Sequence, residues 1–267
     1  MLRKLLKYEL KATARTFLPL YGCLILFAVI NRVFVAIQDR TEHFSFFFGV
    51  SLTSYIFLIV AIFALTVFVM IQRFYKSLLG DEGYLMFTLP TTPGKLILSK
   101  LIISIFWVVV SIAITGFSIM ILAMSTGFWQ AMGQLFQALG LYFREYFSFA
   151  DVSVLTSFLF LGLCGLTYLI LSVYCAIAVG HSFKQHRAIG SVGAYLVICL
   201  ISQVATTLCV QMGGFFTTRL PSLEHLLLYE KYGISLFLLF FAVMYLIFAA
   251  VCYVVTQQLL SKRLNLA

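Results

Sequence analysis

Three polar side chains recur at a regular spacing inside a mainly apolar stretch of the chain. Gln203, Thr207 and Gln211 are each four residues apart, so they align along one face of a helix. Amide and hydroxyl groups in such a row can line a substrate path or a contact with another subunit. The same spacing also suits hydrogen bonds between helices inside one bundle. The sequence leaves these interpretations open.

The residue patterns of common enzymes are absent from the sequence. A G-x-x-x-x-G-K-[ST] phosphate loop is not found, because Gly94 and Lys95 lack the earlier glycine and the hydroxyl residue that should follow. H-E-x-x-H and G-x-S-x-G are also missing, and the four histidines are scattered. We therefore expect a protein that is not an enzyme and that binds no metal or cofactor itself.

The six cysteines all lie inside apolar stretches, without a paired spacing. They are Cys23, Cys164, Cys175, Cys199, Cys209 and Cys252. This placement predicts small apolar residues, with neither a disulfide framework nor a metal site.

Six long apolar stretches must position any functional residue. With 63% hydrophobic and 10% charged residues, a chain of this size could not bury its apolar surface in a water-soluble globule. Each stretch is long enough to cross about 30 Å of hydrocarbon. The stretches are 17–37, 50–71, 96–124, 152–179, 189–212 and 233–255. We expect an all-α polytopic membrane protein, with residues 1–267 forming a single transmembrane domain.

The basic residues gather on one side of these six predicted crossings. Of the 18 Lys and Arg residues, the 13 on this side are Arg3, Lys4, Lys7, Lys11, Arg15, Arg73, Lys76, Lys95, Lys100, Lys184, Arg187, Lys262 and Arg263. By the positive-inside tendency, both termini are predicted to be cytoplasmic, in the cell membrane. The net charge of +9 then reflects loops that face anionic lipid headgroups, and we expect no nucleic-acid partner.

The first 16 residues predict an amphipathic helix that lies along the inner leaflet. On a helical wheel, residues 2 to 17 separate leucines from basic side chains. The chain is then expected to turn into the membrane near Pro19. Glu9 falls within the apolar arc, and it either snorkels or pairs with a nearby lysine, or fixes this helix to a cytoplasmic loop.

Three connections between the crossings carry further predictions. Residues 73–92 form the longest cytoplasmic connection, and Gly80 and Gly83 around its acidic pair suit a turn that leads into a short helix. Thr92 can cap, and Pro93 can start, the third crossing. Residues 125–150 and 213–232 are expected to be extracellular interfacial or re-entrant segments.

The cytoplasmic connection also carries a family resemblance. Its sequence, LLGDEGYLMFTLPTTPGKLILSK, resembles the segment of ABC-2 type transporter permeases in which an acidic residue and a glycine precede Leu-Pro and a lysine that enters the third helix. These residues are Glu82, Gly83, Leu89, Pro90 and Lys100. The N-terminal sequence is similar to that of many Gram-positive members of the family, and the predicted topology matches theirs.

The resemblance implies the membrane subunit of a type-2 ABC exporter, paired with a second copy or a related permease. Two separate nucleotide-binding ATPase subunits would carry the ATP and Mg²⁺. In that family the loop between the second and third helices is a coupling helix. When the coupling helix is carried over to this sequence by position, the candidates for contact with the ATPase are Tyr75, Lys76, Asp81, Glu82, Gly83 and Tyr84. The N-terminal helix with Glu9 would be the connecting helix beside it.

On this resemblance we expect export of a hydrophobic or amphipathic substrate, such as a peptide, a lipid-like molecule or a drug. Two other classes stay open. One is a secondary carrier or channel that works without ATP, and the other is a membrane-embedded immunity or scaffold protein that transports nothing.

Overall fold

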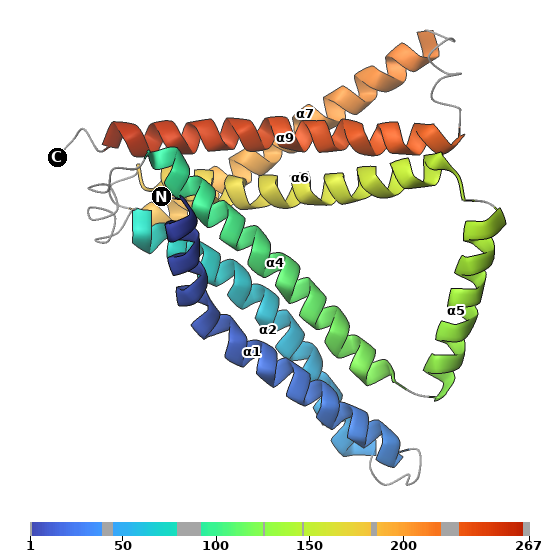
Figure 1. Cartoon of the computed structure of the whole chain (residues 1–267). Coiled ribbons are helices and arrows are strands. Elements are labelled where there is room, and N and C mark those ends of the chain that lie inside the picture. Colours follow the sequence, from blue (N-terminus) through green and yellow to red (C-terminus); the bar gives the residue numbers. More distant parts are fainter. Residues whose placement is uncertain are drawn as a thin grey trace. The chain divides into compact units, whose positions relative to one another are not determined.

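The computed structural model describes residues 2–38, 45–78, 92–124, 126–145, 147–182, 186–219 and 230–263. In these ranges the chain forms seven helices and no strand (Figure 1). With the labels of Figure 1, the helices are α1 (Leu2–Gln38), α2 (Ser45–Leu78), α4 (Pro93–Ala123), α5 (Thr126–Glu145), α6 (Phe149–Gly180), α7 (Arg187–Arg219) and α9 (Glu230–Arg263).

Six of these helices are long and apolar enough to cross a membrane. Their apolar spans are Leu5–Ile37, Gly49–Leu78, Pro93–Ala123, Phe149–Gly180, Arg187–Met212 and Tyr232–Ser261. Each contains most or all of one predicted crossing, so the six predicted helices are confirmed. The remaining helix, α5, falls within the predicted interfacial segment 125–150, and its amphipathic sequence fits that prediction.

The start of two helices follows from local sequence. Pro93 is the first residue of α4, as predicted, and the Lys95 N–H donates to the Thr92 carbonyl at 3.0 Å. Proline suits this position because the first helical N–H needs no partner within the helix. Ser148 precedes α6, and its N–H donates to Asp151 Oδ2 at 2.8 Å, which is half of a capping box.

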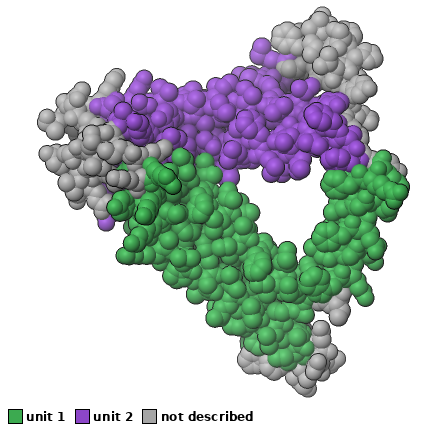
Figure 2. All heavy atoms as spheres, in the orientation of Figure 1, with its two compact units in different colours: residues 1–72, 102–146 green, residues 73–101, 147–267 purple. Residues whose placement is uncertain are grey.

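The chain divides into two compact units (Figure 2). Unit 1 contains residues 1–72 and 102–146, and unit 2 contains residues 73–101 and 147–267. Helices α2 and α4 each contribute residues to both units. The single transmembrane domain expected from composition stays a prediction.

Unit 1 packs α1, α2 and α4 together around an aromatic core. The Tyr21 hydroxyl on α1 lies 2.7 Å from Ser111 Oγ on α4, and Thr66 Oγ1 on α2 lies 3.3 Å from the same atom. The core consists of Phe17, Tyr21, Leu24, Ala28, Tyr55, Ile62, Ile103 and Trp107. Its members on α1 follow one another at three- to four-residue spacing, so they form one continuous face of the helix.

The predicted N-terminal helix is continuous with the first crossing, because α1 runs from Leu2 to Gln38 with Pro19 inside it, and the change of direction near Pro19 stays a prediction. Residues 2–16 therefore form the first turns of α1 and not a separate helix. Proline removes one hydrogen bond within the helix, but the buried face continues on both sides of it. Thr13 and Phe17 before Pro19, and Tyr21 after it, are all buried.

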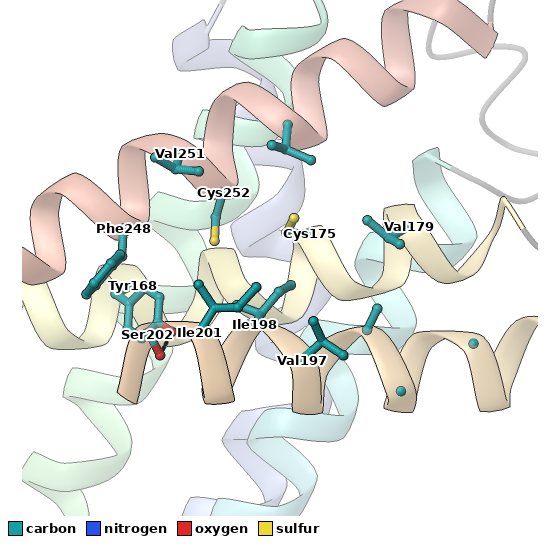
Figure 3. A pocket seen from close by; sticks show the side chains of 14 residues that line it. Tyr168, Cys175, Val179, Val197, Ile198, Ile201, Ser202, Phe248, Val251 and Cys252 are labelled. Atoms are coloured by element: carbon teal, nitrogen blue, oxygen red, sulfur yellow. Dashed lines mark hydrogen bonds between the residues drawn. The ribbon is translucent and has the colours of Figure 1, made fainter. Parts of the chain in front are cut away.

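Unit 2 is built around the parallel pair α6 and α9, with α7 antiparallel to α6. The rings of Tyr168 and Tyr245 stack with centroids 5.7 Å apart. These two residues are 77 positions apart in the sequence. Cys175 and Cys252, each seven residues further along its helix, are also 77 positions apart, and they point toward each other in Figure 3. A constant separation of this kind requires two helices that run in the same direction.

The other predicted connections are described only in part. The short helix expected within residues 73–92 falls mainly on 79–91, which lie outside the described residues. In the predicted outer segment 213–232, α7 continues to Arg219 and α9 begins at Glu230. Helix α7 therefore continues past residue 212, where the fifth crossing was predicted to end. Residues 220–229 lie outside the described part.

Candidate functional site

A cavity of about 570 Å³ lies among α6, α7 and α9 within unit 2 (Figure 3). Its lining residues are Tyr168, Cys175, Val179, Gly190, Gly193, Ala194, Val197, Ile198, Ile201, Ser202, Phe248, Val251, Cys252 and Val255. The volume is in the range of small-molecule sites in proteins. The stretches that line it on α6 and α7 extend toward the short connection between these two helices, which the predicted orientation places on the cytoplasmic side.

The wall of this cavity is almost entirely apolar. Its main polar feature is a pair of hydroxyls, since the Tyr168 hydroxyl donates to Ser202 Oγ at 2.7 Å. Ser202 Oγ in turn donates to the Cys199 carbonyl at 2.9 Å. These hydroxyls have partners within the protein, so the cavity offers mainly hydrophobic contact to an occupant.

Two thiols from different helices face each other at the cavity wall. Cys175 on α6 and Cys252 on α9 are buried, and both are free thiols. In Figure 3 their sulfur atoms point toward one another. Across the described ranges, no three His, Cys, Asp or Glu side chains gather as a metal site. We therefore treat this pair as part of the apolar lining.

The predicted polar row on α7 does not reach this cavity. Gln203, Thr207 and Gln211 are all exposed, and Thr207 Oγ1 donates to the Gln203 carbonyl within the same helix at 2.9 Å. The residue of this stretch that does contact a neighbouring helix is Ser202, through Tyr168. The row therefore lies on a face of α7 that is exposed in the structure, and its role in a substrate path, a subunit contact or hydrogen bonding inside the bundle stays a prediction.

Two of the predicted ATPase-contacting residues lie at the end of α2. Tyr75 is 40% exposed, and its ring centroid lies 6.0 Å from that of His181 on the connection after α6. Lys76 is exposed in the same turn. The other candidates, Asp81, Glu82, Gly83 and Tyr84, lie outside the described residues. The ATPase contact itself stays a prediction.

Glu9 on α1 and Lys100 on α4 lie in the parts of their helices that the predicted orientation places on the cytoplasmic side. Glu9 is half-buried on α1, and its carbonyl accepts a hydrogen bond from Thr13 Oγ1 at 2.8 Å. Both roles considered for its carboxylate stay predictions. Lys100, the lysine of the family-like pattern, is buried on α4 with only 6% of its surface exposed.

The sequence reasoning missed a buried row of hydroxyls on α4. Ser104, Ser111, Thr115 and Ser118 are all buried, and the Tyr55 hydroxyl on α2 lies 2.8 Å from Ser118 Oγ. Such hydrogen bonds between membrane helices each contribute roughly 0.6 kcal/mol. The signal was present, because these residues recur at intervals of three, four and seven along one helical face.

The fold defines the class of this protein. Six apolar helices of sufficient length, in the described part of the chain, make it a polytopic helical membrane protein. No known protein-family model, no curated protein and no solved structure matches the chain. Any function must therefore be inferred from the residues themselves.

Proposed function

We propose that this chain is the membrane subunit of an ATP-driven exporter in the cytoplasmic membrane, with both termini on the cytoplasmic side. It would move a hydrophobic or amphipathic molecule, and a separate ATPase chain would bind ATP and Mg²⁺. The chain lacks a phosphate loop of its own, so the energy of hydrolysis must reach it through a contact between subunits.

The observation that carries this proposal is the sequence between α2 and α4. Residues 79–92 join two apolar helices, and they contain the acidic pair Asp81 and Glu82 followed by Leu89 and Pro90. This is the pattern that resembles ABC-2 type permeases. Basic residues border the segment on both sides, at Lys76 and Lys95, which favours a cytoplasmic location.

The exposed row on α7 supports a second membrane subunit. Gln203, Thr207 and Gln211 lie on the outside of a helix that crosses the membrane. Amides exposed to hydrocarbon are costly because their hydrogen bonds are unmade. A second permease, or a translocation path formed between two permeases, would supply polar partners for this row.

In this proposal, α2 and α4 act as rigid helices that transmit movement from the ATPase into the membrane. Closure of the ATPase dimer on ATP would displace residues 79–92, and this movement would pass directly into α2 and α4. Both helices contribute residues to both compact units. A rigid-body change of this kind can switch the membrane subunits between substrate-accepting and substrate-releasing states.

The test is co-purification of the chain with an ATPase encoded beside it, followed by an ATPase assay with and without candidate substrates. We expect Glu82→Ala and Asp81→Asn to lower the coupled ATPase activity roughly tenfold, since coupling free energies between sites are about 1–3 kcal/mol. Membrane insertion should be unchanged. Glu145→Gln, which removes an exposed acidic residue from α5, is the control and should keep full activity.

Normal coupling in the Glu82→Ala chain would remove Glu82 from the proposal. A chain that purifies without any ATPase, and that takes up substrate in liposomes along an ion gradient, would instead be a secondary carrier.

A second prediction concerns the polar row of α7. Replacing Gln203, Thr207 and Gln211 with Leu, Val and Leu removes the groups that need a polar partner. Because Thr207 Oγ1 already donates within α7, the two amides carry the effect, and we expect transport to fall about sevenfold, since two interhelical hydrogen bonds contribute about 1.2 kcal/mol in total. Transport and the fraction of paired chains in liposomes are measured together.

The control for this triple variant is Thr156→Val, at an exposed threonine of α6 that bonds only within its own helix in the structure. It should transport normally. If the triple variant also pairs and transports like the unmodified chain, the row has no role at an interface or path.

A further inference from the structure

The cavity of unit 2 has a basic group close to one end. An Arg187 guanidinium nitrogen lies 3.2 Å from His181 Nε2, at the connection between α6 and α7. Arg187 comes one turn before Gly190, and His181 comes two residues after Val179; both of these neighbours line the cavity. At a rise of about 1.5 Å per residue, the backbone of Arg187 therefore lies roughly one helical turn beyond the apolar lining.

Arg187 is suited to hold a phosphate group. Its side chain is exposed, and a guanidinium carries five N–H donors, of which the contact with His181 uses one. The planar arrangement of the remaining donors matches the oxygens of a phosphate. His186, next to it, is also exposed.

The cavity itself is suited to hydrocarbon. Its wall has almost no polar surface, and apolar cavities do not retain water. Three of its lining residues, Val197, Ile201 and Val251, are more than half exposed. The cavity therefore opens on the side of unit 2 between α7 and α9, where hydrocarbon chains of a bilayer can enter it.

We propose that this cavity binds one acyl chain of an anionic phospholipid, whose phosphate contacts Arg187. The combination of a hydrocarbon channel and an adjacent arginine selects a molecule that is apolar at one end and negatively charged at the other. Basic pockets between membrane helices commonly hold anionic lipid headgroups in this way. On the predicted orientation, the lipid belongs to the inner leaflet. The site does not depend on the exporter proposal.

The test is native mass spectrometry of the purified full-length chain in detergent with added phosphatidylglycerol or phosphatidylcholine. We expect one phosphatidylglycerol to be retained per chain and phosphatidylcholine to bind more weakly. Arg187→Gln should weaken phosphatidylglycerol binding about fivefold, since a basic residue at an anionic headgroup contributes about this factor. Its control is Arg15→Gln, at an exposed arginine of unit 1, which should bind like the unmodified chain.

A second pair of variants tests the hydrocarbon part of the site. Gly193 lines the cavity, and a Cβ added there meets no atom within 4 Å, so the backbone has room for a side chain; Gly193→Leu should occupy part of the cavity, and the retained lipid should be lost. Gly162 on α6 is also free of neighbours within 4 Å and is exposed away from the cavity. Gly162→Leu is therefore the matched control and should retain the lipid.

A measurement on the unmodified chain covers the case in which Gly193→Leu fails to fold. Phosphatidylglycerol should slow labelling of Cys175 and Cys252 by a small methanethiosulfonate, while Cys23, exposed on α1, should react at the same rate with or without it. Equal retention of both lipids, or thiol labelling that phosphatidylglycerol leaves unchanged, would overturn the proposal. So would an Arg187→Gln chain that binds normally.

Discussion

Gly180→Ala should separate α6 from α7 and destabilise unit 2. A Cβ added at Gly180 would lie 2.5 Å from Ser191 Cα and would overlap the Ser191 backbone nitrogen. The obstacle includes the Ser191 backbone as well as its Oγ, and a change of side-chain rotamer cannot remove it, so one helix must move. We expect a loss of about 3 kcal/mol in the free energy of unfolding, the upper end of the usual cost of overpacking.

The measurement is thermal unfolding in detergent, followed as the loss of the monodisperse peak in size-exclusion chromatography. Gly193→Ala on α7 is the matched control, because its added methyl group meets nothing within 4 Å. That control should be neutral or slightly stabilising, since alanine favours helix over glycine by about 1 kcal/mol. Equal stability of the two variants would show that α6 and α7 do not approach as closely as the structure has them.

Trp107→Ala should destabilise unit 1 by about 3–5 kcal/mol, the range for removal of a large buried aromatic side chain. Trp107 is 6% exposed and stacks on Phe17 with ring centroids 4.5 Å apart. Its indole N–H donates to Thr13 Oγ1 at 2.7 Å. This one side chain therefore holds the first part of α1 against α4 by both apolar contact and a hydrogen bond.

Two variants separate these contributions in the same unfolding assay. Trp107→Phe keeps an aromatic ring but loses the N–H donor, so it should cost only about 1 kcal/mol. Trp129→Ala changes the chain's other tryptophan, which is 61% exposed on α5, and it should leave the stability nearly unchanged. If Trp107→Ala unfolds at the same temperature as Trp129→Ala, the contact between α1 and α4 is not the one described.

The number and positions of the membrane helices could be read from the sequence because length and apolar content alone determine whether a helix can span a bilayer. The start of α4 at Pro93 follows from an equally local rule. Both features depend on neighbouring residues only, and the structure agrees with both.

What could not be predicted depends on contacts between distant parts of the chain. The contact of Trp107 with Phe17, 90 positions away on α1, is one example. The cavity needs α6, α7 and α9 together. No periodicity within one helix indicates which face will meet a parallel partner. The spacing of Gln203, Thr207 and Gln211 places them on one face of α7, but spacing within one helix does not indicate which face a neighbouring helix covers.

The parallel arrangement of α6 and α9 also sets an order of assembly. Two parallel helices cannot pair as a simple hairpin, because the chain must cross the membrane in between. The face of α6 that carries Tyr168 and Cys175 therefore stays without Tyr245 and Cys252 until α7 has been inserted and α9 has followed it. Until then, this face of α6 must be covered by lipid or by the membrane-insertion machinery. Unit 2 can be complete only after α6, α7 and α9 have all been inserted.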